Sequence, residues 1–194
     1  MKTSLKIDKG LVYGTFGIEL YSLSSSVFSG HLGYRKGFYI KGIDEYVENF
    51  NDMHVGILRE LNLKKYTGFF TMAKIPENFF YSNSDDIDIF MSMGISHVCF
   101  PGEECHERGT VNIIIAVYRE LKISAAVDII SMVSSIKAYY LCKNGMGYAT
   151  PSDAIMVSFM KGDNIEFAGP STSLGLNISR ILSLMFEKYF NGYH

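Results

Sequence analysis

The stretch that decides the fold begins with Gly109-Thr110-Val111-Asn112 and continues at once into the apolar run Ile113-Ile114-Ile115-Ala116-Val117. A helical stretch follows from Ser124 to Lys143. The chain then passes through Ala149-Thr150-Pro151-Ser152-Asp153 into a second apolar run, Ala154-Ile155-Met156-Val157. This pattern predicts two buried strands joined by a long helix, each strand preceded by hydroxyl, carboxamide or carboxylate groups. Polar groups beside buried strands cost free energy unless they are hydrogen-bonded or used. We therefore interpret this unit as the scaffold of a functional site.

Outside this unit the sequence predicts more strands and two more helices. The first quarter is rich in β-forming residues. Apolar residues at three- and four-residue steps predict a helix from about Ile43 to Leu61, with Asp44 as its N-cap. A strand is expected over Ile95 to Phe100, and a last helix from about Leu174 to Phe190, with Ser173 as its cap. Strands that dominate early and alternate with helices late favour an α/β (α+β) fold, in which about three main helices pack on a mixed β-sheet.

Composition limits the function classes. The chain has 194 residues, of which 47% are hydrophobic and 20% charged, as expected for a single domain over residues 1–194. The net charge of −2 and the lack of a basic cluster exclude nucleic acid as a partner. Three cysteines cannot build a disulfide framework, which favours a reducing cytoplasm. No apolar stretch approaches the roughly 20 residues of a membrane span, and the charged N-terminus differs from a signal peptide. We expect a soluble, cytoplasmic protein, and leave open a homo-oligomer.

The polar groups before the two central strands are the first candidates for chemistry. Thr110 and Asn112 precede one strand, and Ser152 and Asp153 precede the other. A carboxylate near a hydroxyl and a carboxamide can orient a water, polarise an amide carbonyl or shuttle a proton. The alternative is a loop in which Asp153 and Thr150 satisfy local backbone N–H groups.

Two further candidates for chemistry are a run of three serines and a lysine in the long helix. The run Ser24-Ser25-Ser26 offers hydroxyls that act as nucleophiles only beside a base, and none is adjacent. Its alternative role is hydroxyl pairing across strands. Lys137 lies at the edge of the apolar stripe of its helix, where a lysine either extends to water or holds an anion or oxyanion.

A third group has residues that bind metals. His97, Cys99, Cys105 and His106 lie within ten positions and include ligand types that Zn²⁺ uses. Their spacing matches none of the common zinc patterns, so the alternative is a buried thiol and a hydrogen-bonded histidine.

Taken together, these motifs resemble the adenosylcobinamide amidohydrolases of corrinoid salvage, nearly from end to end. That family has a serine stretch followed by glycines, a short Thr-Ala-Ala segment, a Gly-Thr-Ile-Asn run, a helix bearing Thr-Glu-Ala-Lys, and a Gly-Thr-x-Thr-Asp motif. Similar segments stand here, in the same order, at Ser24-Ser25-Ser26 with Gly30, Thr71-Met72-Ala73, Gly109-Thr110-Val111-Asn112, Ser134-Ser135-Ile136-Lys137 and Ala149-Thr150-Pro151-Ser152-Asp153, followed by Ala168-Gly169 and Leu174-Gly175.

The resemblance implies hydrolysis of the amide that joins aminopropanol to the corrin ring of adenosylcobinamide, giving adenosylcobyric acid. The corrinoid is then a substrate, and no cofactor is required. On this hypothesis Asp153 orients the attacking water or hydroxyl, and Asn112 with Lys137 polarises the carbonyl. Thr110 completes the catalytic group, while the substrate-binding residues are Ser24, Ser25, Gly30, Thr71, Thr150 and Ser152. The corrin is expected against Tyr34, Phe38 or Tyr39.

The sequence also departs from the family pattern. Ser135 stands where the family has a glutamate, and Met72 stands where it has an alanine. These departures favour an altered substrate or weak activity. Two alternatives therefore stand beside the amidohydrolase: a corrinoid-binding protein without catalysis, and a metal-dependent hydrolase of another small molecule.

Overall fold

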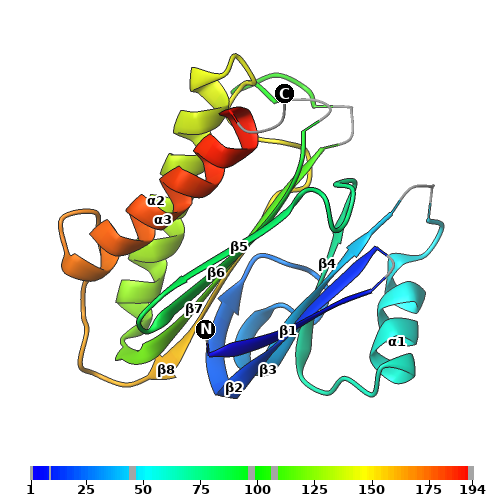
Figure 1. The fold of residues 1–194 in the computed structure, drawn as a ribbon, viewed down its shortest axis with the longest axis horizontal. Coiled ribbons are helices and arrows are strands. Elements are labelled where there is room, and N and C mark those ends of the chain that lie inside the picture. The colour runs from blue at the N-terminus through cyan, green and yellow to red at the C-terminus, as the bar shows by residue number, and fades with distance from the viewer. Residues whose placement is uncertain (1, 9, 44–46, 96–98, 106–108, 192–194) are drawn as a thin grey trace.

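A computed structural model describes residues 2–8, 10–43, 47–95, 99–105 and 109–191. Over these residues the chain forms a single domain with one mixed eight-stranded sheet and three helices (Figure 1), which confirms the predicted fold class. The helices are α1 (Phe50–Glu60), α2 (Ile123–Lys143) and α3 (Ser173–Asn191). The strands are β1 (Thr3–Asp8), β2 (Leu11–Ser24), β3 (His31–Gly42), β4 (Tyr66–Thr71), β5 (Phe79–Ser84), β6 (Ile87–Gly94), β7 (Thr110–Leu121) and β8 (Ala154–Lys161).

The strand order is β4-β3-β2-β8-β7-β6-β5, and β1 pairs with β2 beside this path. The pairs β3·β4 and β7·β8 are parallel, and the other pairs are antiparallel. The predicted central unit is present as β7, α2 and β8, where the helix is the crossover that two parallel strands require. The register pairs Asn112 with Ala154. The polar groups that precede the two strands therefore lie at one end of the sheet.

Two hydrophobic cores lie on opposite faces of the sheet. α2 and α3 cover the face of β5–β8, where Ile129, Val133 and Leu182 are fully buried. On the other face the sheet curls, so that β4 approaches β6 and β7 (Figure 1). The rings of Phe38 on β3 and Phe90 on β6 lie 4.8 Å apart in this second core. The curl therefore places β4 beside the starting end of β7, although the two strands are far apart in the sequence.

Two sequence predictions about the start of a helix are wrong. α1 begins at Phe50 and not near Ile43, because Asn49 accepts hydrogen bonds from the backbone of Asn51 and Asp52 and so caps the helix there. Asp44 lies outside the described residues.

α3 begins at Ser173, which was the predicted cap. Thr172 takes that place, because its hydroxyl accepts from the Gly175 backbone N–H at 3.0 Å. β6 ends at Gly94, where its pairing with β7 starts at Thr110. The strand predicted over Ile95 to Phe100 lies largely outside the described residues. Cys99 forms an isolated bridge to Ala149, and residues 96–98 lie outside the described part of the chain.

α2 also corrects the expectation about membrane spans. It is 21 residues long and apolar enough, by length and composition, to cross a membrane. Its apolar stripe packs on the sheet and against α3, and it carries the buried Lys137. These are the properties of a core helix, since the helix is apolar on the side that faces the protein.

Candidate functional site

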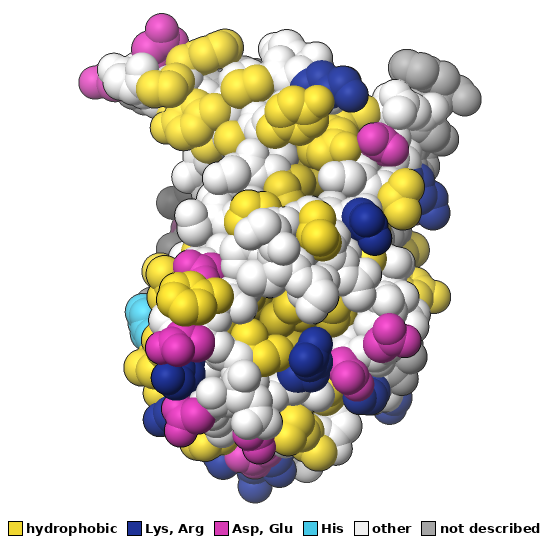
Figure 2. All heavy atoms as spheres, turned by 90° about the vertical axis from the view of Figure 1, so that its left-hand side faces the viewer, with side chains coloured by type: hydrophobic (Ala, Val, Ile, Leu, Met, Phe, Trp, Pro, Cys, Tyr) yellow, Lys and Arg dark blue, Asp and Glu magenta, His cyan; other side chains and the backbone are white. Residues whose placement is uncertain are grey.

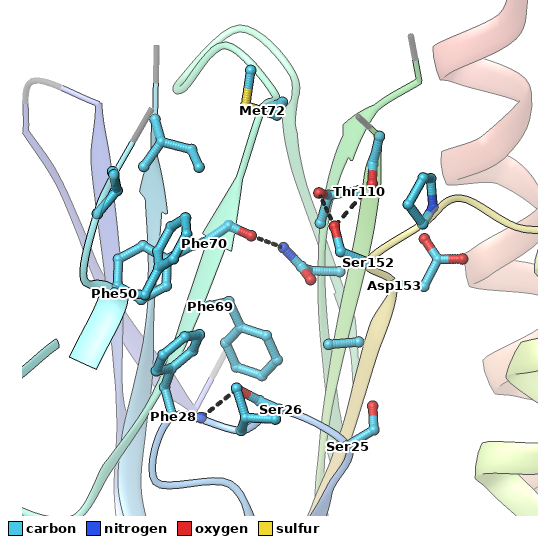
Figure 3. Close-up of a pocket in the computed structure, with 17 residues that line it drawn as sticks. Ser25, Ser26, Phe28, Phe50, Phe69, Phe70, Met72, Thr110, Ser152 and Asp153 are labelled. Atoms are coloured by element: carbon cyan, nitrogen blue, oxygen red, sulfur yellow. Dashed lines mark hydrogen bonds between the residues drawn. The ribbon is translucent and has the colours of Figure 1, made fainter. Parts of the chain in front are cut away.

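A pocket of about 490 Å³ lies between β4, α1 and the starting ends of β7 and β8 (Figure 3). This volume falls in the range of small-molecule sites, roughly 300–1,000 Å³. One wall is polar and comes from the strand ends, and the opposite wall is aromatic. The lining residues are Ser25, Ser26, Val27, Phe28, Ile43, Val47, Phe50, Phe69, Phe70, Met72, Gly109, Thr110, Asn112, Pro151, Ser152, Asp153 and Ala154.

The polar wall contains a pair of hydroxyl groups. Thr110 Oγ1 and Ser152 Oγ lie 2.8 Å apart, and Ser152 Oγ donates to the Gly109 carbonyl at 3.0 Å. Because Ser152 uses its proton on Gly109, the Thr110 hydroxyl is the donor between the two. Thr110 is buried and Ser152 is exposed. The pair thus connects a buried hydroxyl to one that a ligand in the pocket reaches.

Asp153 is held by four hydrogen bonds from the described residues. Its carboxylate accepts from the backbone N–H groups of Val111, at 2.8 Å, and Thr150, at 3.0 Å. It also accepts from the Thr150 hydroxyl and from the ammonium of Lys137. In Figure 3 the Asp153 carboxylate points away from the phenylalanines. A carboxylate has about four lone-pair sites, so these four donors occupy the acceptor positions of Asp153.

Lys137 is buried, and its ion pair with Asp153 joins α2 to the start of β8. The side chains of the two residues are 10% and 11% exposed. Two roles were considered for Lys137: extension to water, or binding of an anion. The structure shows the second, and the anion is the carboxylate of Asp153.

Asn112 lines the pocket but uses its amide nitrogen inside the protein. Nδ2 donates to the Phe70 carbonyl and to Ser92 Oγ, each at 3.3 Å. Which end of the carboxamide is nitrogen is assigned from these two acceptors. The group left for a ligand is the Asn112 oxygen, which accepts hydrogen bonds, whereas the predicted polarisation of a carbonyl would need a donor.

The predicted substrate-binding residues divide into two groups. Ser25 and Ser152 line the pocket and are exposed. The Oγ of Ser25 accepts from the Ile155 backbone N–H at 3.0 Å, which leaves its hydroxyl proton free of that bond. The other four, Ser24, Gly30, Thr71 and Thr150, lie outside the lining and contact neighbouring backbone or Asp153.

Ser24 Oγ accepts from the Ser26 backbone N–H at 3.1 Å, and Thr71 Oγ1 accepts from the Ala73 N–H at 3.0 Å. The buried Thr150 donates its hydroxyl to Asp153. Gly30 is packed so closely on the Ser26 backbone that a Cβ would collide with it. These four residues therefore shape the loops around the pocket.

The aromatic wall was not predicted. The ring of Phe28 lies 4.8 Å from that of Phe70 and 6.1 Å from that of Phe50. The residues predicted to hold a corrin are elsewhere: Phe38 and Tyr39 are fully buried, and Tyr34 is an exposed residue of β3 outside the pocket lining. The alternation of β3 did not reveal that Phe38 and Tyr39 are both buried in the interior. The aromatic wall forms because the sheet curls, and no local pattern in the sequence predicts this curl.

Behind this wall lies a hydrogen-bonded histidine that sequence reasoning missed. The Nδ1 of His54 is 2.6 Å from Tyr39 Oη, and its Nε2 is 2.8 Å from Ser29 Oγ. Burial lowers the pKa of His54 from its ordinary value of 6.5 and raises the pKa of Tyr39 above its usual range. One feature of the sequence could have indicated that His54 is buried: it lies one turn after Phe50 in the predicted apolar helix.

Of the four candidate zinc ligands, the two that the structure describes are bonded to each other. Cys99 and Cys105 form a disulfide with a Cα–Cα distance of 5.3 Å, which removes both thiolates as ligands and also replaces the expected buried thiol. His97 and His106 lie outside the described residues. Among those described, no three His, Cys, Asp or Glu side chains form a metal-binding group. The disulfide also means that cysteine usage no longer supports the expected reducing compartment.

Ser135, the position at which the sequence comparison led us to expect a glutamate, is exposed on α2 and donates to the Ser131 carbonyl at 3.0 Å. It lines a second groove between α2 and α3, together with Tyr139 and Ser179. Figure 2 looks onto this helical side of the molecule, where hydrophobic side chains gather in the upper part and charged ones in the lower. Lys137 is buried on a different side of the same helix, so position 135 does not face the polar wall.

Comparison with known protein families gives a match over most of the chain. A family model described as adenosylcobinamide amidohydrolase matches residues 2–183, which is nearly the whole chain and includes both walls of the pocket. No curated protein matches the chain.

Proposed function

Starting from the fact that the chain belongs to the adenosylcobinamide amidohydrolase family, we propose that it cleaves the aminopropanol amide of adenosylcobinamide to give adenosylcobyric acid. The observation that carries this proposal is the division of the pocket. One wall presents hydroxyl and carboxamide groups, and the facing wall presents aromatic rings. A substrate with a polar amide arm on a large apolar ring needs both.

The corrin ring with its adenosyl group is much larger than a pocket of about 490 Å³. The amide-bearing arm and one edge of the ring therefore enter, and the rest lies over the mouth. Val27 is 68% exposed and lines the pocket next to Phe28. An exposed apolar residue at the rim supplies a contact for the part of the ring that remains outside.

The polar wall then performs the hydrolysis. A water molecule hydrogen-bonded to Ser152 adds to the amide carbon, and the carbon–nitrogen bond breaks. Ser152 Oγ takes the proton lost by the water and gives its own hydroxyl proton, which it otherwise donates to the Gly109 carbonyl, to the leaving amine. The Thr110 hydroxyl donates to Ser152 Oγ and holds it in place for this exchange. The Asn112 oxygen accepts from the substrate amide N–H, which holds the arm in place.

Asp153 and Lys137 support this wall from behind. The Asp153 carboxylate ties the backbone at Val111 to that at Thr150, on either side of the hydroxyl pair. Lys137 neutralises the buried carboxylate. We therefore keep both residues in the proposed catalytic group, as residues that position Thr110 and Ser152.

The direct test is incubation of the purified chain with adenosylcobinamide, followed by detection of free aminopropanol. Ser152→Ala should lower the rate by about 10²-fold or more if this hydroxyl transfers the proton. Ser4→Ala is the matched control, because Ser4 is an exposed hydroxyl of β1, outside the pocket. A folded wild-type chain that releases no aminopropanol contradicts the proposal.

A second candidate is a corrinoid-binding protein without catalysis. It is favoured by one observation: the pocket carboxylate, Asp153, has its acceptor positions filled. The same incubation separates the two functions. A change in the corrinoid absorption spectrum without release of aminopropanol supports binding alone.

A further inference from the structure

His54 connects three parts of the molecule directly behind the aromatic wall. It bonds Tyr39 on β3 and Ser29 in the turn after β2, and it belongs to α1. Its exposed fraction is 7%, and it is the buried residue of α1 among those the structure describes. An amphipathic helix usually attaches through apolar side chains. Here the attachment runs through an imidazole with a hydrogen bond at each end.

The direction of these hydrogen bonds follows from burial. Tyr39 is fully buried, so its hydroxyl proton needs an acceptor, and His54 Nδ1 is in place at 2.6 Å. A neutral imidazole that accepts at Nδ1 donates at Nε2. We therefore assign the Nε2–H to Ser29 Oγ. In this arrangement His54 is not a base for Ser29, and the chain of bonds acts as a brace.

Ser29 lies in a turn that needs such support. Ser29 and His31 have φ values of 52° and 62°, in the left-handed region that side chains with a Cβ rarely adopt. The Ser29 carbonyl accepts from Arg35 Nε at 2.8 Å and from Thr67 Oγ1 at 3.0 Å, while its hydroxyl is held by His54. The turn is thus held through both the carbonyl and the hydroxyl group of Ser29.

Phe28, the residue before this turn, belongs to the aromatic wall. Its ring lies 5.8 Å from the His54 imidazole, and its carbonyl accepts from the Gly68 backbone N–H at 2.8 Å. A Cβ on Gly68 would lie 2.9 Å from His54 Nδ1 and would also collide with Tyr39. The lack of a side chain at position 68 is what allows β4, Tyr39 and His54 to pack together.

We propose that His54 is a positioning residue for the corrinoid site. Through Tyr39 and Ser29 it holds Phe28 and Phe50 at the spacing that receives the apolar edge of the substrate. This inference rests on the proposed function for the identity of the ligand. His54 sets the affinity for the corrinoid, and it has no part in the cleavage of the amide, which takes place at the opposite wall.

The test compares two tyrosine hydroxyls. Tyr39→Phe removes the bond to His54, and Tyr66→Phe removes an equivalent bond, since Tyr66 Oη lies 2.6 Å from Thr15 Oγ1 in the same sheet but outside the pocket lining. We expect Tyr39→Phe to raise KM, and the Kd measured by the corrinoid absorption change, about five-fold or more. The kcat stays within two-fold, and Tyr66→Phe changes neither constant by more than two-fold.

Two histidine variants sharpen the result. In His54→Gln the side-chain amide reaches toward Ser29, and in His54→Leu the shape is retained without any hydrogen bond. The Gln variant should recover most of the affinity that the Leu variant loses. Equal Kd values in wild type, Tyr39→Phe and His54→Leu, with all three folded, would overturn the proposal.

A measurement without ligand keeps this inference separate from the proposed function. The Gly68 amide, which donates to Phe28, should exchange with solvent deuterium at least ten-fold faster in Tyr39→Phe, with no change in Tyr66→Phe. Unchanged exchange means that His54 does not hold the wall. If exchange accelerates but no aminopropanol is ever released, the positioning role stands and the amidohydrolase proposal fails.

Discussion

The ammonium of Lys137 and the carboxylate of Asp153 form a buried ion pair that fastens the middle of α2 to the start of β8. The same carboxylate holds the backbone of Val111 and Thr150. One side chain therefore organises both strand ends of the central unit. Removal of one partner from such a pair leaves an uncompensated buried charge.

Lys137→Met should accordingly lower the free energy of unfolding by about 3–5 kcal/mol. Urea titration measures this change. Lys143→Met, on the exposed last turn of the same helix, is the control and should cost no more than about 1 kcal/mol. Equal losses for the two variants would show that the pair does not support the fold.

The hydroxyls of Thr110 and Ser152 should behave as one unit. If Ser152 transfers the proton and Thr110 holds it in place, Thr110→Val and Ser152→Ala each lower kcat by about 10²-fold, and the double variant is little worse than either single variant. Aminopropanol release at saturating adenosylcobinamide gives kcat for the three proteins. Multiplicative losses in the double variant would indicate that the two hydroxyls act separately.

The stability of the fold should depend on His54 at mildly acidic pH. Burial lowers the pKa of His54 below 6.5, so the unfolded chain binds more protons at this residue than the native chain does. The contribution to stability is present above pH 6.5 and is lost as pH falls toward the lowered pKa. Thermal unfolding between pH 5 and 7.5 should show a steeper decline for wild type than for His54→Gln. His31→Gln, at an exposed position, should follow wild type.

The Cys99–Cys105 disulfide should contribute a modest stability. It closes a short loop with a sequence separation of 6, for which loop entropy predicts about 2 kcal/mol. Cys105→Ser should lose this amount in urea titration, and added reductant should have no further effect on that variant. Cys142→Ser is the control, because Cys142 is exposed and forms no disulfide. A Cys105→Ser protein as stable as wild type would contradict the prediction.

Dialysis against a chelator should leave amide cleavage unchanged. The reason is that Cys99 and Cys105 bond to each other and so supply no thiolate to a metal. Activity that falls on dialysis and returns with added Zn²⁺ would restore the metal-dependent alternative. Elemental analysis of the purified chain is the companion measurement.

The sequence by itself determined the central unit and the class of fold. β7, α2 and β8 follow from hydrophobic runs and a helical stripe, which are local patterns with fixed periods. It also placed polar groups at the ends of the two strands, where the structure pairs Thr110 with Ser152. The boundaries of α1 and α3 were less well determined, since neighbouring hydroxyl and amide side chains can each cap a helix.

Only the tertiary structure decided how the two walls meet. Phe28, Phe50 and Phe70 come from a loop, a helix and an edge strand, and the curl of the sheet brings them opposite the strand ends. Likewise, the number of donors around Asp153 and the contacts of His54 depend on residues far apart in the chain. Periodicity reports which face of an element is buried, but it carries no information on which distant side chain will lie against it.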